Sequence, residues 1–184
     1  MSRRHLRPLV GVAAALLLAF GIAPAWGQPA AVGQAVKATY LYKFLPFIAW
    51  PAGAAPESYA LCVVGDDPFG AILDRAVAGQ TVDGRPVVVR RMPVLRQDAA
   101  CQLVYAAGSA AQPVAAILAG LRGRPTVSVT DGAGDAATRG MVNFVIVDSR
   151  VRFEIDDRLV AEAGLAISSK LLGLATLVRP RNRE

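Results

Sequence analysis

The sequence predicts an α/β fold: a mostly parallel sheet with helices on both faces and an antiparallel terminal hairpin at one edge. Short apolar runs, typical of buried strands, alternate along the chain with segments that have helical patterns. Near the C-terminal end, two apolar runs flank Asp148-Ser149-Arg150, as in a hairpin. No linker or internal repeat divides the chain after the first 27 residues, so residues 28–184 are expected to form a single domain.

The first expected element is a helix over residues 30–48, in which aromatic and aliphatic side chains form neighbouring stripes. Tyr40, Phe44 and Phe47 lie on the aromatic stripe, and Pro46 should kink the end of the helix. A helix that is apolar on nearly every side exceeds what one sheet face can bury. Most aromatic side chains of this helix should pack in the core, and the excess indicates a partner-binding or dimer surface, for which Tyr40, Phe44 and Phe47 are the candidates.

The remaining elements follow from short apolar runs separated by turn residues and helical segments. Strands are expected at residues 59–64, 87–91, 101–106 and 125–130, with the hairpin strands at 141–147 and 151–155. Further helices are expected at residues 68–78, 110–121, 157–163 and 168–178. Asp66 or Asp67 would cap the helix at 68–78, and Pro68 would occupy its first position.

Residues 1–27 are predicted to be a secretory signal peptide. A basic start is followed by an apolar run from Leu9 to Ala23, and Ala25 and Gly27 are the small residues expected before a cleavage site. The alternative is an uncleaved membrane anchor, although the apolar run is shorter than the roughly 20 residues that span a bilayer. The mature protein is therefore expected in the periplasm, as an exported soluble domain.

Removal of the leader changes the chemistry available to the protein. The single histidine of the chain, His5, lies in the leader, so the mature protein would have none. This excludes Ser–His and Cys–His nucleophile pairs and most zinc sites, and we expect no enzyme activity, cofactor or metal. The formal net charge falls from +6 to +3 with the loss of Arg3, Arg4 and Arg7. The remaining charge shows no basic run with interleaved aromatic residues, so no nucleic-acid partner is expected.

Two cysteines in an exported protein favour a disulfide between Cys62 and Cys101. The bond would close a loop of about 40 residues, for which chain entropy predicts about 4 kcal/mol of stabilisation. The alternatives are two independent buried thiols, or a reactive thiol.

Three motifs admit both a chemical and a structural interpretation. "VVGDDPFG" could be a phosphate loop, but its two aspartates would repel an anion and suit helix capping better. "DGAGDAATRG" has the glycine spacing of a dinucleotide loop but no helix after it, which favours a turn or a partner-contacting loop. Ser168-Ser169-Lys170 and Asp156-Asp157 each precede a helix and are expected to cap it, rather than form a hydrolase or metal site.

Four segments together resemble the YfiR family, in that family's order and spacing. They are "KATYLYKFLPFIAWP", "LCVVGDDPFG", "GMVNFVIVDSRVRFEI" and "AGLAISSKLLGLATLV", and they cover nearly all of residues 34 to 180. Cys62 and Cys101 match the family's cysteine pair between the first and third strands. The resemblance thus agrees with the disulfide that is expected for two cysteines in an exported protein.

The resemblance implies a periplasmic, non-enzymatic inhibitor. Such a protein would bind the periplasmic sensor domain of an inner-membrane diguanylate cyclase and repress cyclic-di-GMP production and biofilm formation. It would form a homodimer, and an outer-membrane lipoprotein could sequester it. The alternative is a periplasmic small-ligand-binding module, using the crevice at the carboxyl ends of the strands near Asp66 and Asp131.

This chain departs from the family pattern at three places. The second cysteine pair near the hairpin is missing, Arg139 replaces a glycine, and Asp156 stands where asparagine is usual. We expect the loop around Arg139 to contact a partner, and the family's partner preference there does not carry over to this chain.

Overall fold

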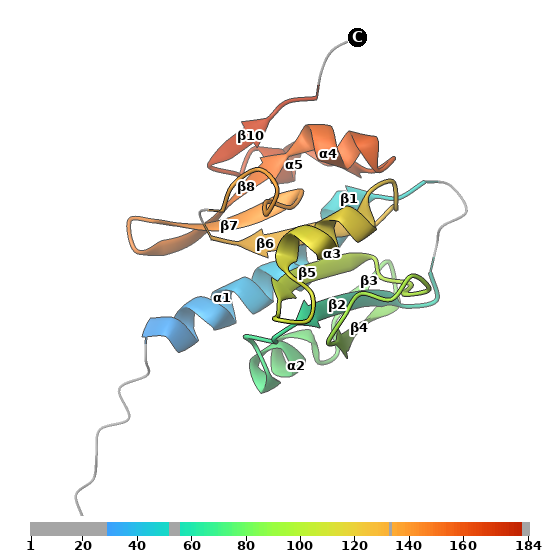
Figure 1. Cartoon of the computed structure of the whole chain (residues 1–184), viewed down its shortest axis with the longest axis vertical. Helices are drawn as coiled ribbons and strands as arrows, with labels where there is room; N and C mark the ends of the chain where they lie inside the picture. Colours follow the sequence, from blue (N-terminus) through green and yellow to red (C-terminus); the bar gives the residue numbers. More distant parts are fainter. Residues whose placement is uncertain (1–28, 52–55, 133, 182–184) are drawn as a thin grey trace, which may run out of the picture.

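The computed structural model describes residues 29–51, 56–132 and 134–181 (Figure 1). The predicted signal peptide at residues 1–27 lies outside the described residues. None of the helices in the described ranges has the length and apolar character needed to cross a bilayer.

An eight-stranded sheet forms the centre of the domain, in the order β10-β8-β7-β6-β5-β2-β4-β3. Its strands are β2 (Tyr59–Gly65), β3 (Thr81–Val82), β4 (Arg85–Met92), β5 (Leu103–Gly108), β6 (Val127–Asp131), β7 (Val142–Val147), β8 (Arg150–Asp156) and β10 (Leu177–Arg179). Neighbouring strands from β4 to β7 are parallel, whereas the β7–β8 hairpin and the short β3–β4 pair are antiparallel. A separate two-stranded antiparallel sheet pairs β1 (Ile48–Ala49) with β9 (Ala166–Ile167).

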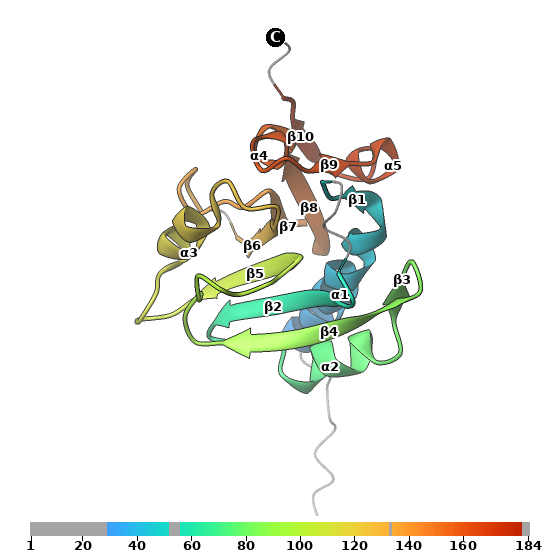
Figure 2. The same cartoon turned by 90° about the vertical axis from the view of Figure 1, so that its right-hand side faces the viewer.

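Helices cover both faces of the sheet, which confirms the predicted fold class. Figure 2 shows α1 and α2 on one side of the central strands and α3 on the other. The helices are α1 (Pro29–Phe44), α2 (Ala71–Val77), α3 (Val114–Leu121), α4 (Asp157–Glu162) and α5 (Ser169–Leu172), and a 3-10 turn, η1 (Leu45–Phe47), follows α1.

Strand β2 shows why the central strands are apolar throughout. Leu61 and Val63 pack into the cluster beneath α1 and α2, whereas Cys62 and Val64 pack into the cluster beneath α3. A strand that is buried on both faces needs apolar side chains at every position, so it shows no alternation of polar and apolar residues.

The C-terminal segment differs from the prediction of a helix over residues 168–178. Only α5 is helical there, and the chain continues after Gly173 into β10, which pairs in parallel with β8. The backbone N–H and the hydroxyl of Thr176 both donate to the carbonyl of Phe153, which begins this pairing. The backbone groups of β10 bond to β8, whereas in a longer helix they would have bonded within the helix. As a result β10 is the edge strand, and the hairpin lies one strand in from the edge.

Several element boundaries also differ from the predicted ones. The predicted start and cap of α2 are wrong: the helix begins at Ala71 rather than residue 68, its N-cap is Gly70, and no side chain caps it. Asp67 instead accepts hydrogen bonds from the N–H groups of Phe69 and Gly70 and forms a turn before the helix. Helix α3 begins after Pro113, whose extended backbone precedes the first turn. The short strands β1, β3 and β9 were not predicted, since two-residue strands leave almost no sequence pattern.

The predicted caps near the C-terminus are confirmed. Asp156 is the N-cap of α4 and accepts a hydrogen bond from the N–H of Leu159 at 3.1 Å. Ser168 is the N-cap of α5 and accepts from the N–H of Leu171 at 3.4 Å. The Asp156-Asp157 and Ser168-Ser169-Lys170 motifs therefore each supply a helix N-cap.

Candidate functional site

Cys62 and Cys101 form a disulfide whose Cα atoms lie 6.0 Å apart. Cys62 lies within β2, and Cys101 lies just before β5, the neighbouring parallel strand. Cys62 is 0% and Cys101 6% exposed, so solvent thiols have little access to the sulfur atoms. In this fold the bond is a structural cross-link between adjacent strands.

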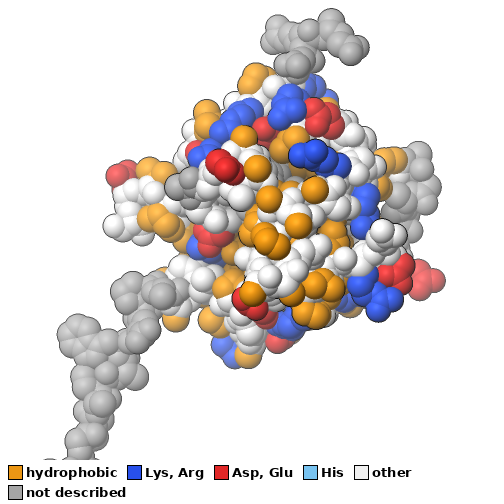
Figure 3. Space-filling model, in the orientation of Figure 1, with side chains coloured by type: hydrophobic (Ala, Val, Ile, Leu, Met, Phe, Trp, Pro, Cys, Tyr) orange, Lys and Arg blue, Asp and Glu red, His pale blue; other side chains and the backbone are white. Residues whose placement is uncertain are grey.

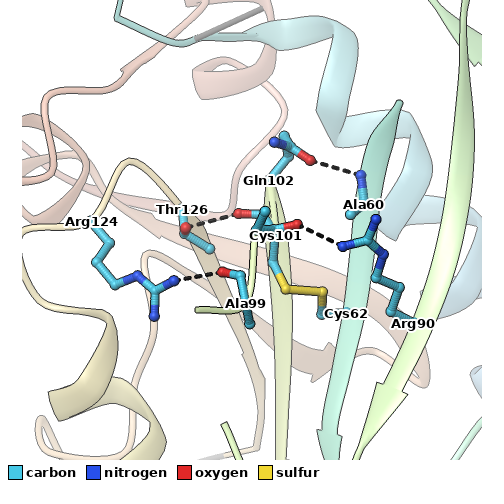
Figure 4. Close-up of a disulfide and its surroundings, with 9 residues drawn as sticks. Ala60, Cys62, Arg90, Ala99, Cys101, Gln102, Arg124 and Thr126 are labelled. Carbon is cyan, nitrogen blue, oxygen red and sulfur yellow. Dashed lines mark hydrogen bonds between the residues drawn. A yellow bond between two sulfur atoms is a disulfide. The ribbon is translucent and has the colours of Figure 1, made fainter. Parts of the chain in front are cut away.

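Side-chain hydrogen bonds hold the segment that carries Cys101 in place (Figure 4). The hydroxyl of Thr126 donates to the carbonyl of Cys101 at 2.8 Å, and Arg124 donates to the carbonyl of Ala99 at 2.6 Å. On the other side, the N–H of Ala60 donates to the side-chain carbonyl of Gln102 at 2.8 Å. These contacts position the segment without a chemically reactive group, so we assign the disulfide region to the scaffold.

The carboxyl ends of β2 and β5 form the point at which a doubly wound sheet usually binds its ligand. Here the two strand ends meet directly: the N–H of Asp66 donates to the carbonyl of Gly108 at 2.9 Å. A Cβ atom on Gly65, whose φ is +97°, would lie 2.3 Å from that same carbonyl oxygen. Only glycine permits this approach, and the backbone itself occupies the space between the strand ends.

Asp131 lies at the same edge, at the end of β6, and is paired within the protein. Its carboxylate forms an ion pair with the ammonium group of Lys37 on α1 and accepts a long hydrogen bond of 3.4 Å from the hydroxyl of Tyr105. Burial raises the pKa of the Tyr105 hydroxyl, and the charge of Asp131 raises it further. The hydroxyl therefore stays protonated and is available as a donor to Asp131.

Asp67 is the third acidic group at this edge, and Arg91 neutralises it. The guanidinium of Arg91 donates to Asp67 at 2.6 Å and to Asp74 at 2.9 Å. Burial alone would raise the pKa of Asp67, but the hydrogen bonds and charge of Arg91, with the N–H groups of Phe69 and Gly70, lower it overall. Asp67 and Asp131 are thus paired within the protein, which counts against the small-ligand alternative, whereas the side chain of Asp66 is exposed.

Of the three aromatic residues predicted to contact a partner, Phe44 is buried, whereas Tyr40 and Phe47 are half-buried. Phe44 is 1% exposed and packs against Phe144 and Phe153 from the hairpin, so its side chain belongs to the core. Tyr40 stacks on Phe44 and remains half-buried, as does Phe47. In this fold the ring of Phe44 is not available to a partner.

The apolar surface near α1 is formed by other residues, which sequence reasoning missed. Val32 is 60% exposed on α1, with Val36 one turn further along, and Ile146 is 62% exposed beside Val147 at the end of β7. Helix α1 contacts β8, the strand that pairs with β7 in the hairpin. The spacing of Val32 and Val36 was the one available signal, since residues four apart share a helix face.

Arg139 lies in the loop between β6 and β7, where the described residues form turns and no helix follows the glycines. Its guanidinium donates to the carbonyl of Gly134 at 2.7 Å and to Glu154 of β8 at 3.1 Å. The dinucleotide interpretation of this loop therefore lacks its structural requirement.

Among the described residues, no group of three or more His, Cys, Asp or Glu side chains is placed to hold a metal ion. The fold and this site together define a disulfide-bonded α/β scaffold, in which Asp67 and Asp131 at the carboxyl edge are paired within the protein.

Comparison with known protein families identifies the family of the chain. Residues 34–176 match the model of the family described as YfiR/HmsC-like, and the chain belongs to this family. The family is regulatory and non-catalytic, and it suggests a periplasmic regulator of diguanylate cyclase signalling that interacts with a membrane signalling partner. A search of the curated proteins found no match to the chain.

Proposed function

We propose that this protein is a periplasmic inhibitor that binds the exported sensor domain of an inner-membrane diguanylate cyclase. By binding one conformation of that domain more tightly, it shifts the population toward the inactive state and lowers cyclic-di-GMP output and biofilm formation. An outer-membrane lipoprotein that sequesters the inhibitor would relieve this repression. The family match over residues 34–176 is the observation that carries the proposal.

Two structural features support a binding role rather than a catalytic one. The carboxyl edge of the sheet is occupied by the contact between Gly65 and Gly108 and by the Lys37–Asp131 ion pair. The surface near α1 carries exposed apolar side chains, which is typical of an interaction site.

The test of the inhibitory function is deletion of the gene, followed by measurement of cyclic-di-GMP. The level should rise in the deletion strain and fall again when the full chain is supplied in trans. A version without residues 1–27 is the matched control, because it keeps the domain but would remain in the cytoplasm and should not restore repression. An unchanged cyclic-di-GMP level after deletion, in a strain with an adjacent cyclase gene, would contradict the proposal.

We also propose that the protein forms a homodimer through the apolar strip of Val32, Val36, Ile146 and Val147. Substitution of Val36 by aspartate would place a charge in that strip and should shift sedimentation velocity from dimer to monomer. Val94→Asp is the matched control, because Val94 is 40% exposed, close to the 37% of Val36. A wild-type protein that sediments as a monomer at micromolar concentration, or an equal shift in both variants, would overturn this assignment.

A further inference from the structure

A groove runs between α3 and α4, away from the apolar strip and from the carboxyl edge of the sheet. It consists of two adjoining cavities of about 180 and 310 Å³, which share Arg122, Arg139 and Leu159 in their walls. Figure 3 looks onto the face that carries α3 and α4, where Lys and Arg side chains gather over α4 and β10 and apolar side chains over α3. The groove thus has two chemically distinct parts.

The floor of the groove is apolar. Leu121 and Met141 are buried there, and Leu118 of α3 and Leu159 of α4, both half-buried, line the same cavity. Burial of partly exposed apolar side chains under a partner lowers the free energy by about 25 cal/mol per Å² of apolar surface. The floor therefore favours an apolar side chain in the occupant.

The rim of the groove is basic. Arg122, Arg139, Arg158 and Arg179 line it, and within the described ranges Arg122 forms no ion pair. Arg139 is paired with Glu154 at 3.1 Å and Arg158 with Glu162 at 2.8 Å. The remaining carboxylate, Asp156, already caps α4.

Asp156 forms no hydrogen bond with the arginines of the rim. Arg158 and Arg179 approach its carboxylate only at 3.7 and 3.8 Å, which is too far for a hydrogen bond. Each guanidinium has five N–H donors, so Arg122, Arg158 and Arg179 keep donors that point to no acceptor among the described side chains. A carboxylate from another molecule would supply the missing acceptor, and carboxylate–arginine bonds are among the strong charge-assisted ones.

We propose that this groove binds an acidic segment of a protein partner, with an aspartate or glutamate on the arginine rim and a neighbouring apolar side chain on the Leu118–Leu159 floor. The proposal rests on the proposed function in one respect, that the protein acts by contact with another protein. A protein segment fits better than a small molecule, because small-ligand sites converge polar groups in an enclosed pocket. An apolar centre with arginines around it is instead the usual anatomy of a protein interface.

The test begins with selection of random heptapeptides, displayed on phage, against the immobilised, disulfide-bonded protein. The selected peptides should be enriched in Asp or Glu next to Leu, Phe or Met. A synthetic copy of the most frequent peptide is then labelled with fluorescein and titrated with protein, with anisotropy as the readout. Affinity should fall as salt rises from 50 to 500 mM, because exposed ion pairs are screened.

Charge reversal at the rim locates the binding site. Arg122→Glu should weaken peptide binding about fivefold, and Arg122→Glu with Arg158→Glu about tenfold or more, which corresponds to about 1.4 kcal/mol. Arg75→Glu on α2 is the matched control, since Arg75 is exposed, makes no ion pair among the described residues and lies outside the groove. Because Arg122 makes no ion pair in the described part of the chain, its single substitution stays informative even if the double variant is unstable.

Three outcomes would overturn the proposal: selection without enrichment of acidic residues, binding that survives the double substitution, or an equal loss with Arg75→Glu. The experiment measures no cyclic-di-GMP, so its failure is separate from failure of the inhibitory function. Peptide binding together with unchanged cyclic-di-GMP after gene deletion would retain the groove and reject the cyclase as the partner.

Discussion

The two faces of the sheet are stabilised in different ways. The face under α1 and α2 buries large side chains, and Phe44 packs there against both Phe144 and Phe153. Among the residues that the structure describes, the face under α3 buries mostly Ala, Val and Cys side chains, with Ile117 and Leu121 as the larger ones, and it contains the Cys62–Cys101 bond. One face is stabilised by burial of large aromatic side chains, whereas on the other face a disulfide adds to a core of smaller side chains.

The strongest expected effect comes from the aromatic face. Phe44→Ala should lower the free energy of unfolding by about 5 kcal/mol, the upper end for this substitution, because the ring is fully enclosed and its neighbours cannot close the cavity. Urea unfolding followed by circular dichroism measures the change. A loss below about 2 kcal/mol would show that the ring contributes little and that the comparison of the two faces is wrong.

Removal of the disulfide tests the opposite face. Cys62→Ala together with Cys101→Ala should cost about 4 kcal/mol, because the unfolded chain regains the entropy of a 39-residue separation. Hydrogen exchange should increase more in α3 and β5 than in α1, since the bond lies in the thinner cluster. Equal protection losses on both faces would indicate that the bond acts on the whole domain alike.

The Lys37–Asp131 pair joins α1 to the carboxyl edge of the sheet and should matter less. Lys37→Met should cost about 2 kcal/mol, less than a fully buried pair, because the Asp131 side chain is 28% exposed and water still screens it. Tyr105→Phe is the control, and its 3.4 Å hydrogen bond to Asp131 should contribute less than about 0.5 kcal/mol. Thermal unfolding of both variants gives the comparison, and a larger effect from Tyr105→Phe would contradict it.

The smallest effect concerns Asp67, which Arg91 holds in its charged form. Asp67→Asn should cost about 1 kcal/mol at pH 7, because the pair is partly exposed and its attraction is screened. The folded-state pKa of Asp67 lies below its ordinary value of 3.8, so this stability is present above that value and is lost as pH falls through the folded pKa. Urea unfolding at pH 7, 5 and 3 should show the two proteins converging at the lowest pH, and a constant difference would rule out the carboxylate charge as the cause.

The sequence predicted those parts of the fold that depend on local pattern. Continuous apolar runs located β2, β5 and β7, and Asp156 and Ser168 preceded helices that they cap. The bond between the two cysteines was predicted from their number together with the expected export of the chain.

The parts that could not be predicted depend on contacts between distant residues. β10 forms because β8 lies beside it, and the residues Leu177–Arg179 have no pattern of their own that distinguishes strand from helix. Phe44 was expected on a surface because the rings that cover it, Phe144 and Phe153, come from the hairpin about 100 residues later. The arginine rim likewise joins α3, α4 and β10, so its charge is visible only once the chain is folded.

The position of the Cys62–Cys101 bond also affects how the molecule responds to proteases. The segment between the two cysteines contains α2, β3 and β4, one edge of the sheet, and its ends are covalently joined. A single cut anywhere between residues 63 and 100 therefore leaves one covalent molecule, whose two fragments separate in electrophoresis only after reduction. Nicked and intact copies of this regulator would carry the same mass except for one added water.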